Sequence, residues 1–180
     1  MRPYILNWIK NQGGSPAPSE YNAKSSTEIS YVVGQIRAEK ALQLVEELPA
    51  ELTIASGAIF RSIMQSFFEG MTALKSLPYI DTTGQTNFYH LANSCPLLEN
   101  VPAYNTASIT NVNGLNGMFT NCNKLTNESL NNIMQMCINA VNYPGTKTLK
   151  FVGLTQAQAT TCQSLSNWDA FVAAGWTTGY

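Results

Sequence analysis

Charged side chains are scarce in this sequence, and clustered positive charge is absent. Charged residues make up 12% of the 180 positions, roughly half of the 25% typical of soluble domains. The formal net charge is −1, and lysine and arginine form no patch. Because binding to a phosphate backbone needs concentrated positive charge, we expect no nucleic-acid partner. Asn, Thr and Ser replace charge toward the C-terminus, which predicts a neutral, hydrogen-bonding surface.

Long apolar runs and enzyme motifs are also missing. No run approaches the roughly 18 apolar residues that span a bilayer, so we expect no membrane insertion. The first apolar stretch is interrupted by Asn7 and is too short for a secretory signal. We therefore expect neither a secretory signal peptide nor a membrane anchor. The chain has no P-loop, HExxH or GxSxG motif. The sequence therefore favours a protein that is not an enzyme and takes no cofactor.

The strongest positive pattern is an internal repeat. Residues 67–78, 91–102 and 118–125 align with one another, residues 79–87 align with 103–111, and a degenerate copy lies at 45–49. The spacings between Pro49, Pro78 and Pro102 fall within the range typical of stacked repeats. One such unit cannot bury its apolar face alone, so several must stack.

Each repeat predicts a turn or short helix followed by a short strand. The strand is expected at Leu-x-x-Leu/Val-Pro, with Ile80 or Tyr104 after it. Asp81 and Asn105 then lie where the chain turns, because these residue types bond nearby backbone groups. The spacing leaves open whether Tyr79 or Ile80 faces inward.

The cysteines occupy a repeated position. Cys95 and Cys122 align with Met71, which favours a small apolar core residue over a redox centre or disulfide. Core thiols are also expected at the other two cysteines. The sequence has no CxxC pair of the kind that binds zinc, so we predict no metal site. The four cysteines are Cys95, Cys122, Cys137 and Cys162.

Two groups of residues could in principle be catalytic. His90, the single histidine, could pair with Cys95 as base and nucleophile, but the repeat places Cys95 in the core. Asp81 could belong to a pair of glycosidase carboxylates, but its aligned residue is Asn105. We therefore favour a loop or a place between repeats for His90 and a turn for Asp81, with no catalytic residue.

The repeated phrase resembles a known family. It is L-x-x-x-P-x-x-[DN]-T-x-x-x-T-N followed by M-F-x-x-C-x-x-L, and residues 105–122 match it best. The phrase resembles the BspA-like irregular leucine-rich repeats over roughly residues 45–125, although the middle unit is three residues short. The resemblance implies an α/β repeat fold, a short leucine-rich-repeat solenoid with a helical N-terminal segment and an α/β C-terminal cap. It implies three parts: 1–37 for attachment or oligomerisation, 38–126 for the repeats and 127–180 for the cap.

Segments outside the repeats have their own patterns. Residues 2–12 and 27–47 indicate helices on either side of a Gly/Ser/Pro linker at 13–19. Residues 127–141 indicate a helix with Leu130, Ile133, Met134 and Cys137 on one face. A strand is expected at 148–152, and helices from Thr155 and over 168–174.

Binding residues are expected on the outer side of the predicted strands, although a merely solvated surface is an equal alternative. Such faces of stacked repeats are commonly used for recognition. A second candidate is an aromatic-rich anchor at the N-terminus, with packing onto its own domain as the alternative. The strand candidates are Lys75, Ser76, Tyr79, Glu99, Asn100 and Ala103, and the anchor candidates are Tyr4, Ile5 and Trp8.

The resemblance, the neutral surface and the separate N-terminal arm favour a bacteriophage virion protein, such as a tail or head fibre component, located in the virion or outside the cell. Its expected partners are other virion proteins or a host-surface protein or glycan. Virion fibres are usually homo-oligomers and often trimers, so we expect self-association. A bacterial cell-surface adhesin module is the main alternative, and an intracellular interaction scaffold is a third.

Overall fold

The computed structural model describes residues 64–180. The expected attachment segment 1–37, the helix over 27–47 and the degenerate repeat at 45–49 lie outside the described residues. The anchor candidates Tyr4, Ile5 and Trp8 lie outside them as well.

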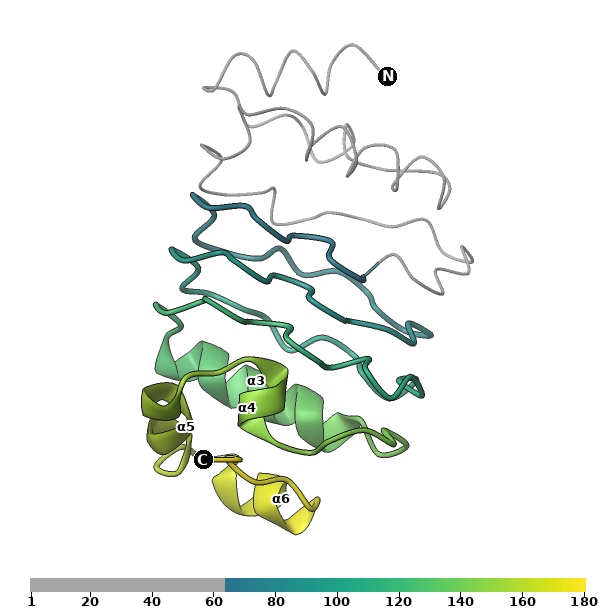
Figure 1. Cartoon of the computed structure of the whole chain (residues 1–180). Coiled ribbons are helices and arrows are strands. Elements are labelled where there is room, and N and C mark those ends of the chain that lie inside the picture. The colour runs from purple at the N-terminus through teal and green to yellow at the C-terminus, as the bar shows by residue number, and fades with distance from the viewer. Residues whose placement is uncertain (1–63) are drawn as a thin grey trace.

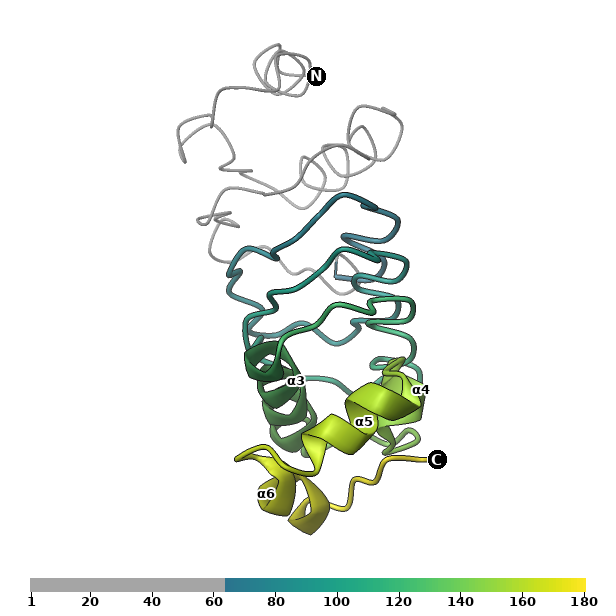
Figure 2. The same cartoon turned by 90° about the vertical axis from the view of Figure 1, so that its left-hand side faces the viewer.

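The described chain has two regions, which we call the stacked turns (64–126) and the helical cap (127–180). The turns are a first turn over 64–87, a second over 88–114 and a third over 115–126. They lie one upon another, and helices α3 to α6 close the end of the stack (Figures 1 and 2). A single apolar core runs through both regions.

The expected α/β fold class is wrong. Within 64–180 there is no β-strand, and isolated bridges occur in its place, among them the parallel pairs Ser76 to Asn100 and Thr148 to Thr177. Among the residues that the structure describes, helices occur only in the cap, so the stacked turns are coil and the cap is not α/β. The leucine-rich-repeat solenoid and the strand expected at 148–152 are therefore both rejected.

The spacing of buried residues gives one physical reason. A β-strand turns alternate side chains to opposite faces, so its buried residues recur with a period of two. In the first turn a series of five buried apolar residues recurs with a period of three, and Phe67 and Thr82 are buried beside it. The series is Phe68, Met71, Leu74, Leu77 and Ile80, and the equivalents in the second turn are Ala92, Cys95, Leu98, Val101 and Tyr104.

Backbone hydrogen bonding gives a second reason. Alternate N–H groups of the first turn donate within the turn, as Phe67 does to Met64 and Glu69 to Ser66. The N–H groups between them donate to the second turn, as Phe68 does to Leu91 at 2.7 Å. The second turn repeats this alternation toward the third. Over 66–71 and 90–94 the chain is thus a series of tight local turns that is also bonded to the neighbouring turn, which differs from the regular ladder of a strand.

Two aligned positions adopt a left-handed backbone conformation in every turn, and Gly84 does so as well in the first turn. One position holds Ser66, His90 and Gly117, with φ of 53°, 55° and 62°. The other, four residues later, holds Gly70, Ser94 and Asn121, with φ of 77°, 62° and 63°. Non-glycine residues rarely adopt positive φ, so its recurrence at aligned positions shows that the stack imposes this path on the chain.

The cap follows its local sequence signals. Helix α3 spans Asn127–Asn139, α4 Leu149–Val152, α5 Gln156–Cys162 and α6 Trp168–Ala173. The helices expected at 127–141, from Thr155 and over 168–174 are confirmed as α3, α5 and α6. Threonine side chains cap α3, α4 and α5 at their N-termini, which satisfies N–H groups that lack a partner within the helix.

The cap also completes the bonding pattern of the last turn. The N–H groups of Gly117 and Phe119 donate to the carbonyls of Phe151 and Val152 in α4. The buried amide of Gln158 donates to the carbonyl of Cys122 at 2.7 Å. Because buried backbone groups are normally paired, the cap supplies the partners that a further turn would otherwise provide. No helix in residues 64–180 is both long enough and apolar enough to cross a membrane.

Candidate binding surface and inter-turn polar network

The six binding residues predicted on the strands lie together on two adjacent turns. Ser76 and Asn100 lie at the centre of this group. The amide of Asn100 donates to the Ser76 hydroxyl at 3.1 Å. The backbone joins the same two segments, since Leu77 N–H donates to the Asn100 carbonyl at 2.9 Å. We call the set Lys75, Ser76, Tyr79, Glu99, Asn100 and Ala103 the outer strip.

Tyr79 is the exposed aromatic residue of the outer strip. Its side chain is 60% exposed, whereas Ile80 is 1% exposed, which settles that Ile80 faces inward. The second turn repeats this arrangement in part, with Ala103 half-buried and Tyr104 inside. The Tyr104 hydroxyl donates to the Pro78 carbonyl at 2.7 Å, and burial raises the pKa of Tyr104 above its usual range. The strip therefore presents one exposed ring, with a methyl group at the equivalent position in the next turn.

Lys75 and Glu99 occupy equivalent positions at one side of the strip and are partly buried. The Glu99 N–H donates to the Lys75 carbonyl at 2.8 Å. The Glu99 carbonyl in turn accepts from the Ser129 hydroxyl of α3 at 2.8 Å. The backbone of this side is thus fixed by the stack and by the cap, so its side chains are held on a rigid support.

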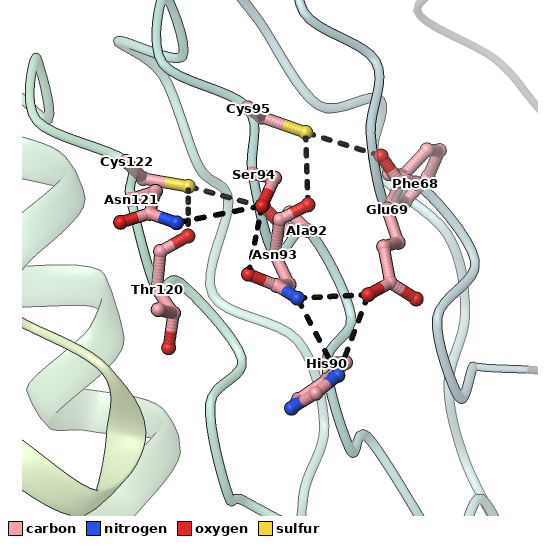
Figure 3. A network of polar contacts seen from close by, with 10 residues as sticks. All are labelled: Phe68, Glu69, His90, Ala92, Asn93, Ser94, Cys95, Thr120, Asn121 and Cys122. Carbon is pink, nitrogen blue, oxygen red and sulfur yellow. Dashed lines mark hydrogen bonds and ion pairs between the residues drawn. The ribbon is translucent and has the colours of Figure 1, made fainter.

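A second polar group lies on another part of the stack, where Glu69, His90 and Asn93 converge (Figure 3). His90 Nδ1 is 3.4 Å from Glu69 Oε1, and Asn93 Nδ2 is 2.8 Å from the same oxygen. Asn93 Nδ2 is also 3.4 Å from His90 Nδ1. The three side chains therefore form a triangle that joins the first turn to the second.

Neighbouring residues hold this triangle in place. The His90 ring stacks on Tyr89 with centroids 3.8 Å apart, and it lies so close to Gly117 that a Cβ there would be 2.6 Å from His90 Cδ2. The Ser94 hydroxyl donates to Asn93 Oδ1 at 3.1 Å. The side chains of His90 and Glu69 keep 29% and 34% exposure, so the triangle is ordered and still open to solvent. The expected place of His90 between repeats is confirmed.

The four cysteines are buried and free, which confirms them as core thiols. The thiols of Cys95 and Cys122 donate to carbonyls of the preceding turn, each at 3.1 Å. Burial raises the pKa of Cys95 to about 11 and that of Cys122 to about 12. A thiol in this state is a poor nucleophile, and the hydrogen bonds of the Cys95 thiol go to backbone carbonyls rather than to His90.

Asp81 has the turn role expected for it. Its carboxylate accepts the Thr83 N–H at 3.0 Å, and Asn105 accepts the Ala107 N–H at 3.1 Å in the same way. The hydrogen bonds from Thr83 lower the pKa of Asp81. No group of three or more His, Cys, Asp or Glu side chains that could hold a metal ion occurs in the described part of the chain.

The sequence reasoning missed the polar pairs between turns. Glu69 pairs with Asn93, and Ser76 pairs with Asn100, each across the same interval of 24 positions, which is the repeat period. Pairing polar residues at that spacing would have found both. The contact of His90 with Glu69 has a weaker signal in the sequence, because only the stacking of the turns brings Glu69 close to His90.

Comparison of the chain with protein-family models, with curated proteins and with solved structures finds no match.

Proposed function

We propose that the chain is a non-catalytic component of a bacteriophage virion, of the tail or head fibre type, and that its outer strip binds a protein or glycan of the host or another virion protein. The observation that carries this proposal is the outer strip itself. Tyr79, Asn100 and their neighbours are displayed on a backbone fixed from both sides, and their side chains are not needed for the core. The resemblance of the repeated phrase to BspA-like repeats supports the phage setting.

A rigid, neutral surface suits recognition for energetic reasons. Side chains that already bond to each other, as Asn100 and Ser76 do, lose little conformational entropy on binding. Aromatic residues are enriched among those that dominate binding energy, and Tyr79 is the exposed ring of the strip. Amide and hydroxyl groups on Asn100 and Ser76 add hydrogen-bonding capacity without the desolvation cost of charge.

The virion setting can be tested by locating the protein. An antibody raised against the chain should label purified phage particles in electron micrographs. Labelling of uninfected bacterial cells instead would contradict the virion proposal and support the adhesin alternative. Labelling of neither would favour the intracellular scaffold.

The outer strip can be tested separately with fluorescently labelled protein on host cells. Tyr79→Ala and Ala103→Arg should each reduce cell binding at least tenfold, because one removes the exposed ring and the other fills the space beside it. Thr110→Arg is the matched control, since Thr110 is exposed but lies outside the strip. Equal binding by all three variants would reject the strip as the binding surface.

Self-association through the N-terminal arm is a further part of the proposal. Light scattering of the full chain should give the mass of a homo-oligomer, a trimer being the usual form for such fibres. Replacement of Tyr4, Ile5 and Trp8 together by serine should reduce it to a monomer. A full chain that is already monomeric would reject the anchor.

A further inference from the structure

We infer that Glu69, His90 and Asn93 form a binding site for a divalent transition-metal ion, of the kind that accepts mixed nitrogen and oxygen ligands, such as Zn²⁺ or Ni²⁺. The inference is independent of the proposed function, because these residues lie outside the outer strip. The observation that carries it is the triangle of side-chain atoms between the first and second turns (Figure 3).

The dimensions of the triangle fit a metal ion. Its edges measure 2.8, 3.4 and 3.4 Å between Glu69 Oε1, His90 Nδ1 and the Asn93 amide. Ligand atoms about 2.1 Å from an ion in tetrahedral or octahedral geometry lie about 3.0 to 3.4 Å from one another. An ion placed just above the triangle would therefore reach all three atoms with little movement of the side chains.

The Asn93 side chain can supply an oxygen to the ion by turning its amide through half a turn. As it stands, its nitrogen donates to Glu69 and its oxygen accepts from the Ser94 hydroxyl at 3.1 Å. After the turn its oxygen faces Glu69 and His90, and its nitrogen can donate to the Ser94 oxygen. Both orientations leave the amide hydrogen-bonded, so the metal-free and metal-bound forms are each satisfied.

The donor set indicates the class of metal. A neutral imidazole suits Zn²⁺, Ni²⁺ and Cu²⁺, whereas Mg²⁺ and Ca²⁺ prefer oxygen ligands alone. The carboxylate of Glu69 contributes the negative charge, and water completes the coordination shell because the site is partly exposed. The His90 ring is already fixed by Tyr89 and by Gly117, and such preorganisation strengthens binding.

An ion at this site would join two turns of the stack. Glu69 belongs to the first turn, while His90 and Asn93 belong to the second. A ligand that binds the folded state alone stabilises it by mass action. We therefore expect Ni²⁺ or Zn²⁺ to raise the melting temperature of the protein, a readout that does not depend on any partner.

The test is calorimetric titration of the full chain, free of any histidine tag, with NiCl₂ and ZnCl₂. We expect one ion per chain, with affinity reduced at least tenfold in both Glu69→Gln and His90→Gln and a smaller loss in Asn93→Ala. Asn100→Ala is the matched control, because it removes the equivalent inter-turn amide bond to Ser76 and should leave metal binding unchanged.

A second measurement needs no variant. His90 is the only histidine in the chain, so bound Ni²⁺ should broaden the one imidazole signal in the NMR spectrum at equimolar metal. Absence of binding to the full chain, an unaffected imidazole signal, or undiminished binding in the His90 and Glu69 variants would overturn the inference. The last result would indicate the buried thiols or an adventitious ion only.

Discussion

The stacked turns and the helical cap share one apolar core but hold their backbones by different means. In the cap, the helices bond within themselves, and threonine side chains such as Thr155 pair with N–H groups three residues away. The long-range backbone bonds of the cap lie around Thr177, which joins the C-terminal end to the start of α4. In the turns, alternate N–H groups reach carbonyls of the next turn, as Phe68 does to Leu91 and Ala92 to Met118. Local bonds can be recognised in a short stretch of sequence, whereas the bonds of the turns exist only once neighbours have stacked.

The comparison predicts that the turns depend on the cap. Trp176 is 1% exposed and packs its ring 5.8 Å from Tyr143 and 5.7 Å from Phe171. Trp176→Ala should therefore lower the free energy of unfolding by about 3 to 5 kcal/mol, measured by chemical denaturation. The turns and the cap should unfold together in one cooperative transition, since the last turn donates its N–H groups to the cap.

The exposed Val172 of α6 provides the control for that variant. Val172→Ala should change stability by less than about 0.5 kcal/mol. If Trp176→Ala instead unfolded the cap and left the protection of the turns against hydrogen exchange intact, the dependence of the turns on the cap would be rejected.

The left-handed positions of the turns predict a smaller effect. A Cβ on Gly117 would be 2.6 Å from the His90 ring, whereas one on Gly70 would meet nothing within 4 Å. Both glycines have positive φ, so each alanine variant bears a backbone cost of about 1 kcal/mol. Gly117→Ala should cost about 2 kcal/mol more through overpacking. Equal costs in thermal denaturation would show that His90 does not constrain this position.

Alkaline pH should destabilise both regions through their buried thiols. Burial raises the pKa of Cys95 from 9.0 to about 11 and that of Cys162 from 9.0 to about 11. The folded state then holds protons that the unfolded state has released. The contribution is complete below pH 9 and is lost as the pH rises toward 11, with a slope of up to about 1.4 kcal/mol per pH unit for each thiol.

Denaturation curves measured from pH 7 to 11 check this prediction. Cys95→Ala should reduce the slope above pH 9, and so should Cys162→Ala. A free energy of unfolding that stays flat up to pH 11 would contradict the burial of the thiols.

Single hydrogen bonds provide the finest comparison between the regions. Thr155→Ala removes the N-cap of α5, and Thr82→Val removes a bond of 2.9 Å to the Asn105 carbonyl in the next turn. Each should cost about 1 kcal/mol. Hydrogen exchange should accelerate within α5 in the first variant and in two adjacent turns in the second. The same local pattern in both would show that the turns are not coupled through such bonds.

The predicted strands failed for a reason that the sequence contained. Leu74 and Leu77, like Leu98 and Val101, are three residues apart, a spacing that a strand with a period of two cannot bury on one face. Pro78 and Pro102 follow directly and lack the N–H group that would extend a ladder. The segment 148–152 failed differently: Thr148 proved to be the N-cap of a short helix rather than the start of a strand.

Part of the candidate sites could be inferred in advance. The alignment placed the six residues of the outer strip on one surface of two adjacent turns, and it placed the cysteines in the core. It did not identify the triangle, because Glu69 and His90 do not share an aligned position in the repeats. Their contact arises because His90 extends its ring across the boundary between turns.

The sequence alone was enough to predict the core position of the cysteines, the cap helices α3, α5 and α6 and the equivalence of positions between turns, whereas it predicted a strand in place of α4. Apolar side chains, helix-capping threonines and the internal repeat are local or periodic properties of the chain. The path of the backbone through the turns could not be predicted in the same way. That path depends on left-handed residues at His90 and Ser94 and on hydrogen bonds to the next turn, which form only when the turns are stacked.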